Sequence, residues 1–184
     1  MKRVVAALLL VALLLCGCAP SSRPAPDGQP PMAAIRSAVL AHGSRMPDGS
    51  CRIQRQKGTL LFAVTAPPDR GAFFSLEMRA AGLRHTFAIV PDVSRGVCAC
   101  TYAVTGGDKP LRINGSIDAR AYPKDGSITA DESPDYPAAR ARELFEQYTP
   151  LLLDAVQEML EGCGAAAAVR DLFPGFIRKN AIRI

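Results

Sequence analysis

The sequence predicts an α+β domain in which an antiparallel meander sheet of about five to seven strands carries helices on one face. Between residues 51 and 130, apolar and polar residues alternate with a period of two, and turns rich in Gly and Pro interrupt them at short intervals. Residues 137–163 instead repeat apolar positions every three or four residues. A short N-terminal helix and a long C-terminal helix, packed on one face of the sheet, are therefore expected to flank the strands.

The first helix is expected at residues 32–41, where apolar residues recur at helical spacing between Met32 and Leu40. The prolines immediately before it are suited to a first helical turn, and His42-Gly43 ends it. Residues 43–50 contain a Pro-Asp-Gly turn and are expected to form a loop.

Seven strands are expected after this loop, joined by short turns. They cover residues 51–56, 59–66, 72–78, 83–90, 97–104, 111–121 and 127–130. The pattern is clearest in the sixth, where Leu111, Ile113, Gly115 and Ile117 share one face and polar residues take the other. The short turns leave no room for the helical crossovers of a parallel sheet, so the pairing is expected to be antiparallel.

The long helix is expected over residues 137–163, with Pro150 in its middle. Because proline lacks a backbone N–H, we expect a kink there, or two helices with Thr149 as a cap. The polar side of this helix, which includes Gln147, Asp154 and Gln157, is expected to face solvent. Residues 165–172 form a further short helix in this interpretation.

A basic and apolar tail follows at residues 174–184. Phe173, Phe176 and Ile177 precede Arg178 and Lys179, so this segment either packs its aromatic rings against the domain or contacts lipid headgroups.

The N-terminus has the features of a secretory signal: a charged start at Met1-Lys2-Arg3 and an apolar run over residues 4–15. A run of this length is too short for a transmembrane helix, which needs about 20 residues. Its end, Leu15-Cys16-Gly17-Cys18, resembles the lipobox of bacterial lipoproteins. The resemblance implies cleavage after Gly17 and lipidation of Cys18. An ordinary signal peptide, cut at another small residue, is the alternative.

The resemblance divides the chain into a signal peptide (1–17), a lipidated Cys with a Pro-rich tether (18–31), a single α+β domain (32–173) and the tail (174–184). At about 3.1 Å per extended residue, the tether spans roughly 40 Å. The implied location is the cell envelope, with the membrane as a partner through the lipid on Cys18. Because Ala19 rather than Asp follows the Cys, the resemblance implies the periplasmic face of the outer membrane if the source is Gram-negative.

Charge argues against nucleic acid as a partner. Removal of residues 1–17 takes away Lys2 and Arg3, so the formal net charge falls from +5 to +3. This mild excess, spread over the rest of the chain, is not the basic surface of a nucleic-acid-binding domain.

Four cysteines remain after processing: Cys51, Cys98, Cys100 and Cys163. An even number in an exported chain favours disulfides. Cys98 and Cys100 lie two apart on one strand, so their Cα atoms are too far apart and their side chains too parallel to bond to each other. Two pairings are left open: Cys51–Cys98 with Cys100–Cys163, or Cys51–Cys100 with Cys98–Cys163. Free buried thiols are the alternative, and the spacing does not fit a metal site.

The sequence contains no recognisable catalytic or cofactor-binding motif, and we expect no catalytic residue, metal or cofactor. The two histidines, His42 and His85, are expected at a helix end and on the inward face of a strand. The predicted function is that of a lipid-anchored envelope accessory protein that binds an envelope protein partner or supports an assembly. Two alternatives remain: a carrier of a lipid or apolar ligand between sheet and helix, and an enzyme whose site is assembled from distant residues.

Overall fold

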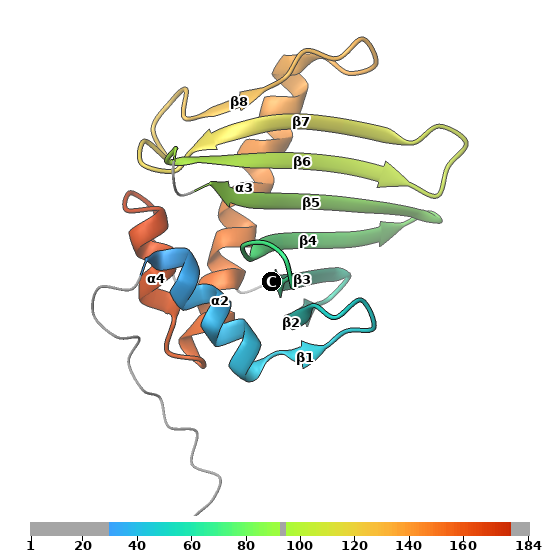
Figure 1. Ribbon diagram of the computed structural model, residues 1–184. Helices are drawn as coiled ribbons and strands as arrows, with labels where there is room; N and C mark the ends of the chain where they lie inside the picture. The colour runs from blue at the N-terminus through green and yellow to red at the C-terminus, as the bar shows by residue number, and fades with distance from the viewer. Residues whose placement is uncertain (1–29, 93–94, 178–184) are drawn as a thin grey trace, which may run out of the picture.

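The computed structural model describes residues 30–92 and 95–177 (Figure 1). The helices are α2 (Pro31–His42), α3 (Ala138–Glu161) and α4 (Ala166–Leu172). The strands are β1 (Ser44–Arg45), β2 (Cys51–Lys57), β3 (Leu60–Ala66), β4 (Phe73–Ala80), β5 (Leu83–Asp92), β6 (Val97–Thr105), β7 (Leu111–Asp118) and β8 (Ile128–Ala130). The predicted α+β class is confirmed.

The strands form one antiparallel sheet in the order in which they occur along the chain, β1 to β8. The seven predicted strands correspond to β2–β8, and β1 is an additional strand within the predicted 43–50 loop. The chain reverses between β1 and β2 because the Met46 N–H donates to the Ser50 carbonyl and the Asp48 carboxylate accepts from the Ser50 N–H and hydroxyl. Two paired residues are too few to produce an alternating pattern, so β1 has no signature in the sequence.

The predicted two-faced pattern of the sheet is also confirmed. Register places Ile113 beside Tyr102, and Ile117 between Cys98 and Ile128. The inward-facing side chains are mostly large and apolar, and include Val64, Phe74, Leu76, Phe87, Ile89, Ile113 and Ile117, all buried. Alternate positions carry small or polar side chains on the opposite face, as an antiparallel sheet with one packed face requires.

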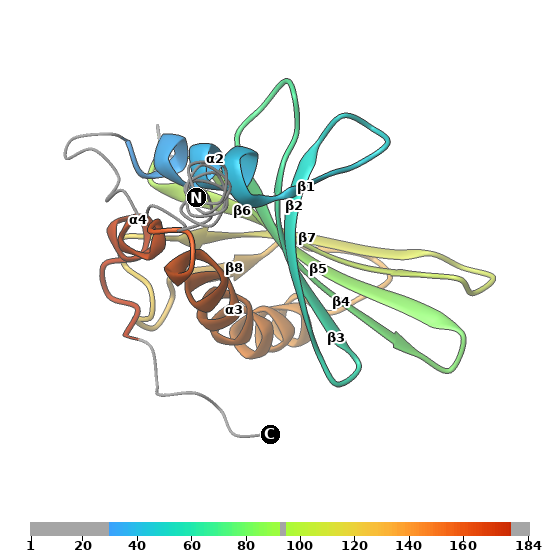
Figure 2. The same ribbon diagram turned by 90° about the horizontal axis from the view of Figure 1, so that it is seen from below.

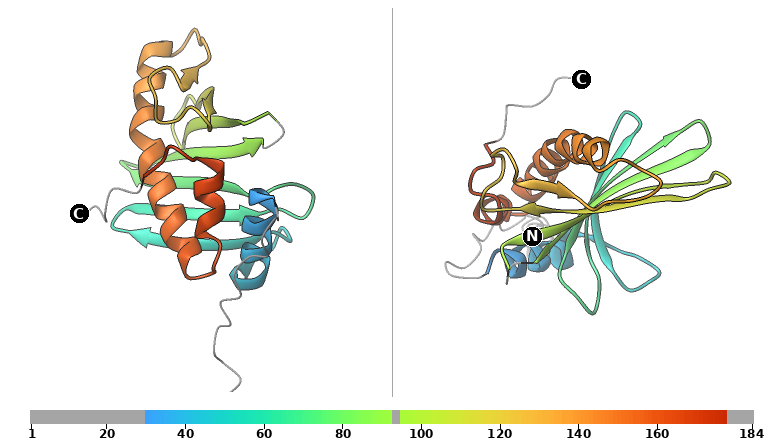
Figure 3. Two further views of the ribbon diagram at one scale, coloured as in Figure 1. Left: turned by 90° about the vertical axis from the view of Figure 1, so that its left-hand side faces the viewer. Right: turned by 90° about the horizontal axis from the view of Figure 1, so that it is seen from above.

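The long helix α3 crosses the strands, with β8 near its N-terminal half and β2 near its C-terminal end (Figure 3, left). The Phe145 ring packs against Phe87, and the Tyr148 ring stacks on Tyr102 with centroids 5.9 Å apart. Leu152, Val156 and Leu160 continue this buried stripe. The spacing of these residues by three to four positions is the helical pattern that predicted the contact.

Helices α2 and α4 complete the helical layer, which gathers on one side of β2 and β3 (Figure 2). Ile35 and Val39 of α2 are fully buried. The Arg36 guanidinium of α2 donates to the carbonyl oxygens of Pro67, Pro68 and Arg70, which fastens α2 to the β3–β4 loop. None of the described helices is long and apolar enough to cross a membrane.

The predicted break at Pro150 does not divide the long helix. Helix α3 is continuous from Ala138 to Glu161, and Thr149 lies inside it, fully buried, rather than at a cap. Among the described residues the Thr149 hydroxyl has no hydrogen-bond partner. Packing against the sheet on both sides of Pro150 outweighs the one backbone hydrogen bond that proline removes.

The predicted solvent-facing side of α3 is partly covered. Asp154 is 8% exposed and Gln157 is 4% exposed. Helix α4 contacts α3 on this side, and Gly175, Phe176 and Ile177 lie beside Asp154. The sequence pattern could not reveal this cover because it comes from residues that follow the helix.

The predicted disulfides are not present: Cys51, Cys98, Cys100 and Cys163 are free thiols. Both predicted pairings joined Cys51 on β2 to a cysteine on β6. Three strands lie between β2 and β6, so at about 4.8 Å per strand the two are separated by roughly 19 Å. A disulfide requires Cα atoms within about 7 Å, so sheet order excludes both pairings.

Candidate functional site

The principal candidate site is a groove of about 670 Å³ on the side of α3 that faces away from the sheet. Three segments line it: the β7–β8 connection, the middle of α3 and the segment after α4. Its lining residues are Tyr122, Pro123, Gln147, Pro150, Leu151, Asp154, Gly175, Phe176 and Ile177. We refer to these nine residues as the α3 groove. Its volume lies within the range of small-molecule sites, about 300–1,000 Å³.

Helical geometry explains why these α3 residues share one face. At 3.6 residues per turn, Gln147, Pro150, Leu151 and Asp154 lie on one side, roughly opposite the sheet-facing Phe145. Pro150 has no N–H to donate to the Glu146 carbonyl one turn earlier, so this carbonyl lacks its intrahelical partner. The groove wall therefore combines apolar surface with a backbone acceptor nearby.

Tyr122 holds the other wall in place. Its ring is buried and contacts Phe173 edge-on and Phe176 at a tilt, with both centroids 6.2 Å away. Gly175 lies so close that a Cβ there would be 2.3 Å from the Tyr122 carbonyl oxygen. Glycine is therefore required for the segment after α4 to pack on this turn.

This packing decides between the two interpretations of the tail as far as residue 177. Phe173 is fully buried and Phe176 is half-buried, so both aromatic rings pack against the domain. Ile177, at 82% exposure, is the apolar side chain left at the mouth of the groove. Residues 178–184 lie outside the described part of the chain.

Polar groups occur at a few points in this apolar lining. The Asp154 carboxylate is largely buried in the wall, and Gln147 lies one and a half to two turns before it on the exposed rim. Burial raises the pKa of the Tyr122 phenol to about 12, so it stays protonated in the physiological range. An adjoining cavity of about 220 Å³ shares Tyr122 and Pro123 and adds Lys124, Asp125 and Glu146.

The lining of the α3 groove is suited to binding an apolar group. Flat apolar surfaces from Pro123, Pro150, Leu151 and Phe176 can bury an apolar group. Asp154 and Gln147 can accept hydrogen bonds from a donor on that group. An apolar lining with a few polar groups is the usual composition of a ligand pocket.

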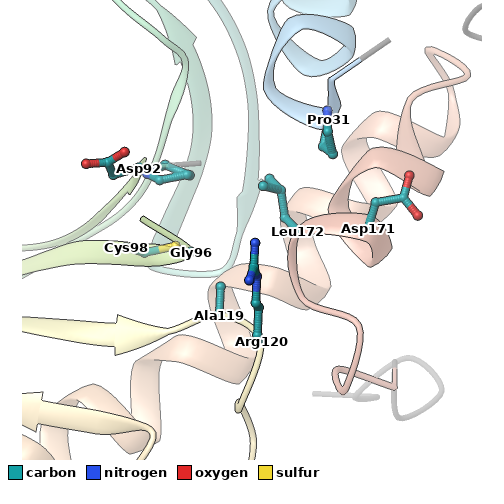
Figure 4. A pocket seen from close by; sticks show the side chains of 9 residues that line it. Pro31, Asp92, Gly96, Cys98, Ala119, Arg120, Asp171 and Leu172 are labelled. Carbon is teal, nitrogen blue, oxygen red and sulfur yellow. The ribbon is translucent and has the colours of Figure 1, made fainter. Parts of the chain in front are cut away.

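A second, smaller cavity of about 90 Å³ lies between the start of α2, the end of α4 and the ends of β5–β7 (Figure 4). Cys98 is at its base, Arg120 projects into it, and Asp92 and Asp171 flank it. Burial raises the pKa of the Cys98 thiol to about 12. Because the thiolate is the nucleophilic form, this burial disfavours reactivity of the Cys98 thiol at neutral pH.

Burial also favours the protonated form of the Cys100 and Cys163 thiols. Burial raises the pKa of Cys100 to about 12 and also raises that of Cys163, whose Sγ lies 3.7 Å from the Met159 carbonyl oxygen. Cys51 is half-buried at the start of β2. The sequence-predicted cysteines are therefore spread over β2, β6 and the end of α3 rather than brought into one site.

The two histidines lie where the sequence predicted. His42 is in the last turn of α2, and His85 is on the inward face of β5, where its Nδ1 is 2.7 Å from the Tyr102 hydroxyl oxygen. Tyr102 is buried under Tyr148, and burial raises its pKa to about 12. This His–Tyr contact belongs to the packed interface between sheet and α3, where the remaining cavity measures about 10 Å³.

Two further predictions concern metal and lipid. Within residues 30–92 and 95–177, no group of three His, Cys, Asp or Glu side chains is arranged to hold a metal ion. Cys18 and the rest of the predicted lipobox lie outside the described residues.

Most residues of the α3 groove were not identifiable from the sequence as site residues. Tyr122 and Pro123 occur in a turn pattern, and Leu151 fits the apolar stripe of a helix. The one local signal was Pro150 within a strong helical pattern. A proline inside a helix leaves a backbone carbonyl one turn earlier without its intrahelical hydrogen bond.

No family model, curated protein or solved structure matches this chain.

Proposed function

We propose that this protein is a lipid-anchored accessory protein of the cell envelope that binds an apolar group of its partner in the α3 groove. The observation that supports binding is the groove of about 670 Å³ with its apolar lining. The observation that supports the anchor is the lipobox resemblance at Leu15-Cys16-Gly17-Cys18. Together they describe a binding domain that a tether holds near a membrane surface.

The alternative hypothesis, a carrier of an apolar ligand, requires a different binding place from the one expected between sheet and helix. A ligand between sheet and α3 would need space there, but that interface is filled by Phe87, Tyr102 and Tyr148 around a cavity of about 10 Å³. The α3 groove, on the opposite side of the helix, is the larger space, at about 670 Å³. An apolar ligand is therefore better placed in the α3 groove than in the core.

The anchor is tested by replacing Cys18 with alanine. The processed wild-type protein should fractionate with membranes, because two or more acyl chains bind a bilayer stably. Cys18→Ala should appear as an unprocessed precursor or as a soluble form. Cys16→Ala is the matched control, since it removes the neighbouring thiol at the variable lipobox position. It should change neither the mass increase that lipidation of Cys18 produces nor the fractionation with membranes. Wild-type-like membrane partition of Cys18→Ala would contradict the anchor.

The groove is tested with Nile red, a neutral apolar dye, and the variant Leu151→Gln. This substitution removes a half-buried apolar side chain from the groove wall, so dye affinity should fall by roughly fivefold, equivalent to about 1 kcal/mol of apolar burial. Leu40→Gln is the matched control because Leu40 is a half-exposed leucine on α2. Equal dye binding by both variants and wild type would remove the α3 groove as the binding site.

A further inference from the structure

Within the part of the chain that the structure describes, one edge of strand β2 is free of a neighbouring strand along most of its length. Its neighbour β1 pairs only with Cys51 and Arg52, whereas β3 pairs with all of β2 from Cys51 to Lys57. Residues Ile53–Lys57 therefore have a sheet partner on one side only (Figure 1). Gln54, Arg55 and Gln56 are exposed, so neither face of the sheet is covered at this part of β2.

The β2–β3 turn determines which backbone groups point outward. Gly58 and Thr59 form a two-residue hairpin loop with a positive φ of 58° at Gly58 alone, as in a type II′ turn. Lys57 and Leu60 then form the closing hydrogen-bonded pair, and hydrogen-bonded pairs alternate along the strand. Arg55 and Ile53 bond to β3, while Gln54 and Gln56 direct their N–H and C=O groups to the free edge.

Two side chains along this edge, Arg55 and Lys57, are basic. Arg55 and Lys57 lie on the inward face and both contact the Glu158 carboxylate, at 2.5 and 2.7 Å. One carboxylate cannot neutralise two cations, and Arg45, opposite Cys51 on the same face, adds further positive charge on β1. The third inward residue of the free edge, Ile53, is half-buried and packs against the core.

We propose that the free edge of β2 binds an extended acidic segment of a partner protein, which adds to the sheet as a ninth strand. The outward N–H and C=O groups of Gln54 and Gln56 supply the backbone pairing, as in other β-strand additions. If the partner strand runs antiparallel to β2, five consecutive partner residues face Lys57 to Ile53. The first and third of them are acidic, the fifth is apolar, and the second and fourth can be any residue. The acids then lie opposite Lys57 and Arg55, and the apolar residue lies opposite Ile53.

A second copy of this chain is a poorer occupant. Two β2 strands paired symmetrically about Arg55 would place this arginine opposite its own copy, and like charges directly opposite each other destabilise a strand pair. The positive charges of Arg55 and Lys57 therefore favour a partner strand with acidic side chains. This surface is also separate from the α3 groove, so the two sites can be tested independently.

The proposal is tested with a capped peptide of sequence Thr-Glu-Thr-Glu-Thr-Val-Thr and the full chain, ¹⁵N-labelled, in detergent micelles. Titration into the millimolar range should give saturable NMR shifts centred on the amides of Gln54 and Gln56, whose hydrogen exchange should slow. A peptide with Lys in place of Glu should give no saturable shift. Added salt should weaken binding because ion pairs contribute to it.

Two variants at one position distinguish backbone pairing from charge attraction. Gln56→Pro removes an outward N–H but no bond to β3, and proline is tolerated on an edge strand, so the domain should fold and lose peptide binding. Gln56→Thr keeps the N–H and should bind as wild type does. The proposal is overturned by absence of saturable binding, by equal binding of the lysine peptide, by unchanged binding in Gln56→Pro, or by shifts centred on the α3 groove.

Discussion

Leu152→Asp is expected to abolish folding of the domain. Leu152 is fully buried where α3 packs on the sheet. Loss of a buried leucine costs about 2–5 kcal/mol, and a carboxylate without a partner in that place adds several more. The total approaches the whole stability of a typical domain, about 5–15 kcal/mol. Circular dichroism should show loss of the cooperative thermal transition.

The neighbouring residue provides the control for this experiment. Leu151 is half-exposed on the opposite side of α3, in the groove, so Leu151→Asp places the same carboxylate within reach of water. This variant should keep a cooperative transition and lose dye binding instead. If Leu152→Asp melted like Leu151→Asp, the described packing of α3 on the sheet would be wrong.

Gly115→Val is expected to produce the second-largest effect, although it adds only three carbon atoms. A Cβ at Gly115 would lie 2.2 Å from the Thr129 carbonyl oxygen and 2.5 Å from Phe145 Cε2. The β7–β8 pair and the helix must both move to accommodate it. Overpacking of this kind costs about 3 kcal/mol or more, which corresponds to a fall in Tm of roughly 10 °C.

Asn114→Val is the matched control on the same strand. Asn114 is exposed on the outward face, where valine suits a strand and meets no helix. Its Tm should stay within a few degrees of wild type in the same calorimetric scan. An unchanged Tm in Gly115→Val would contradict the close approach of Phe145 to β7.

The local pattern of apolar and polar residues was sufficient to predict most of the fold. The strand alternation at residues 111–117 identified the inward face correctly, because one buried and one wet face impose a period of two. The turn at Gly58 and the apolar stripe of α3 are likewise local features. The continuity of α3 through Pro150 was not predictable, because it depends on how much of the helix packs against distant strands.

The cysteine pairings were wrong for a different reason. Spacing along the chain excluded a Cys98–Cys100 bond, but the distance from Cys51 to either residue depends on how many strands intervene. The predicted meander already places neighbouring strands in chain order, so the pairings were inconsistent with the predicted sheet itself. The observed sequential order confirms the meander and places three strands between β2 and β6.

The candidate site was less predictable than the fold, because its three segments, residues 122–123, 147–154 and 175–177, are separated along the sequence. Asp154 was expected in solvent because its neighbours along the polar side of α3 are charged. It is buried because Gly175, Phe176 and Ile177 return across the helix. Contacts of this kind, made by irregular chain, have no periodicity to detect.

The sequential order of the strands also determines when each part of the molecule can form. Every strand from β2 to β8 pairs with the strand just before it, so the sheet can form hairpin by hairpin in chain order. Helix α2 can cover part of β2 and β3 early, but most of the apolar face has no such early partner, since α3 begins only at Ala138. Until that helix arrives, the nascent sheet displays Val64, Phe74, Phe87 and Ile89 to its surroundings, which is the interval in which chaperones would protect it from aggregation.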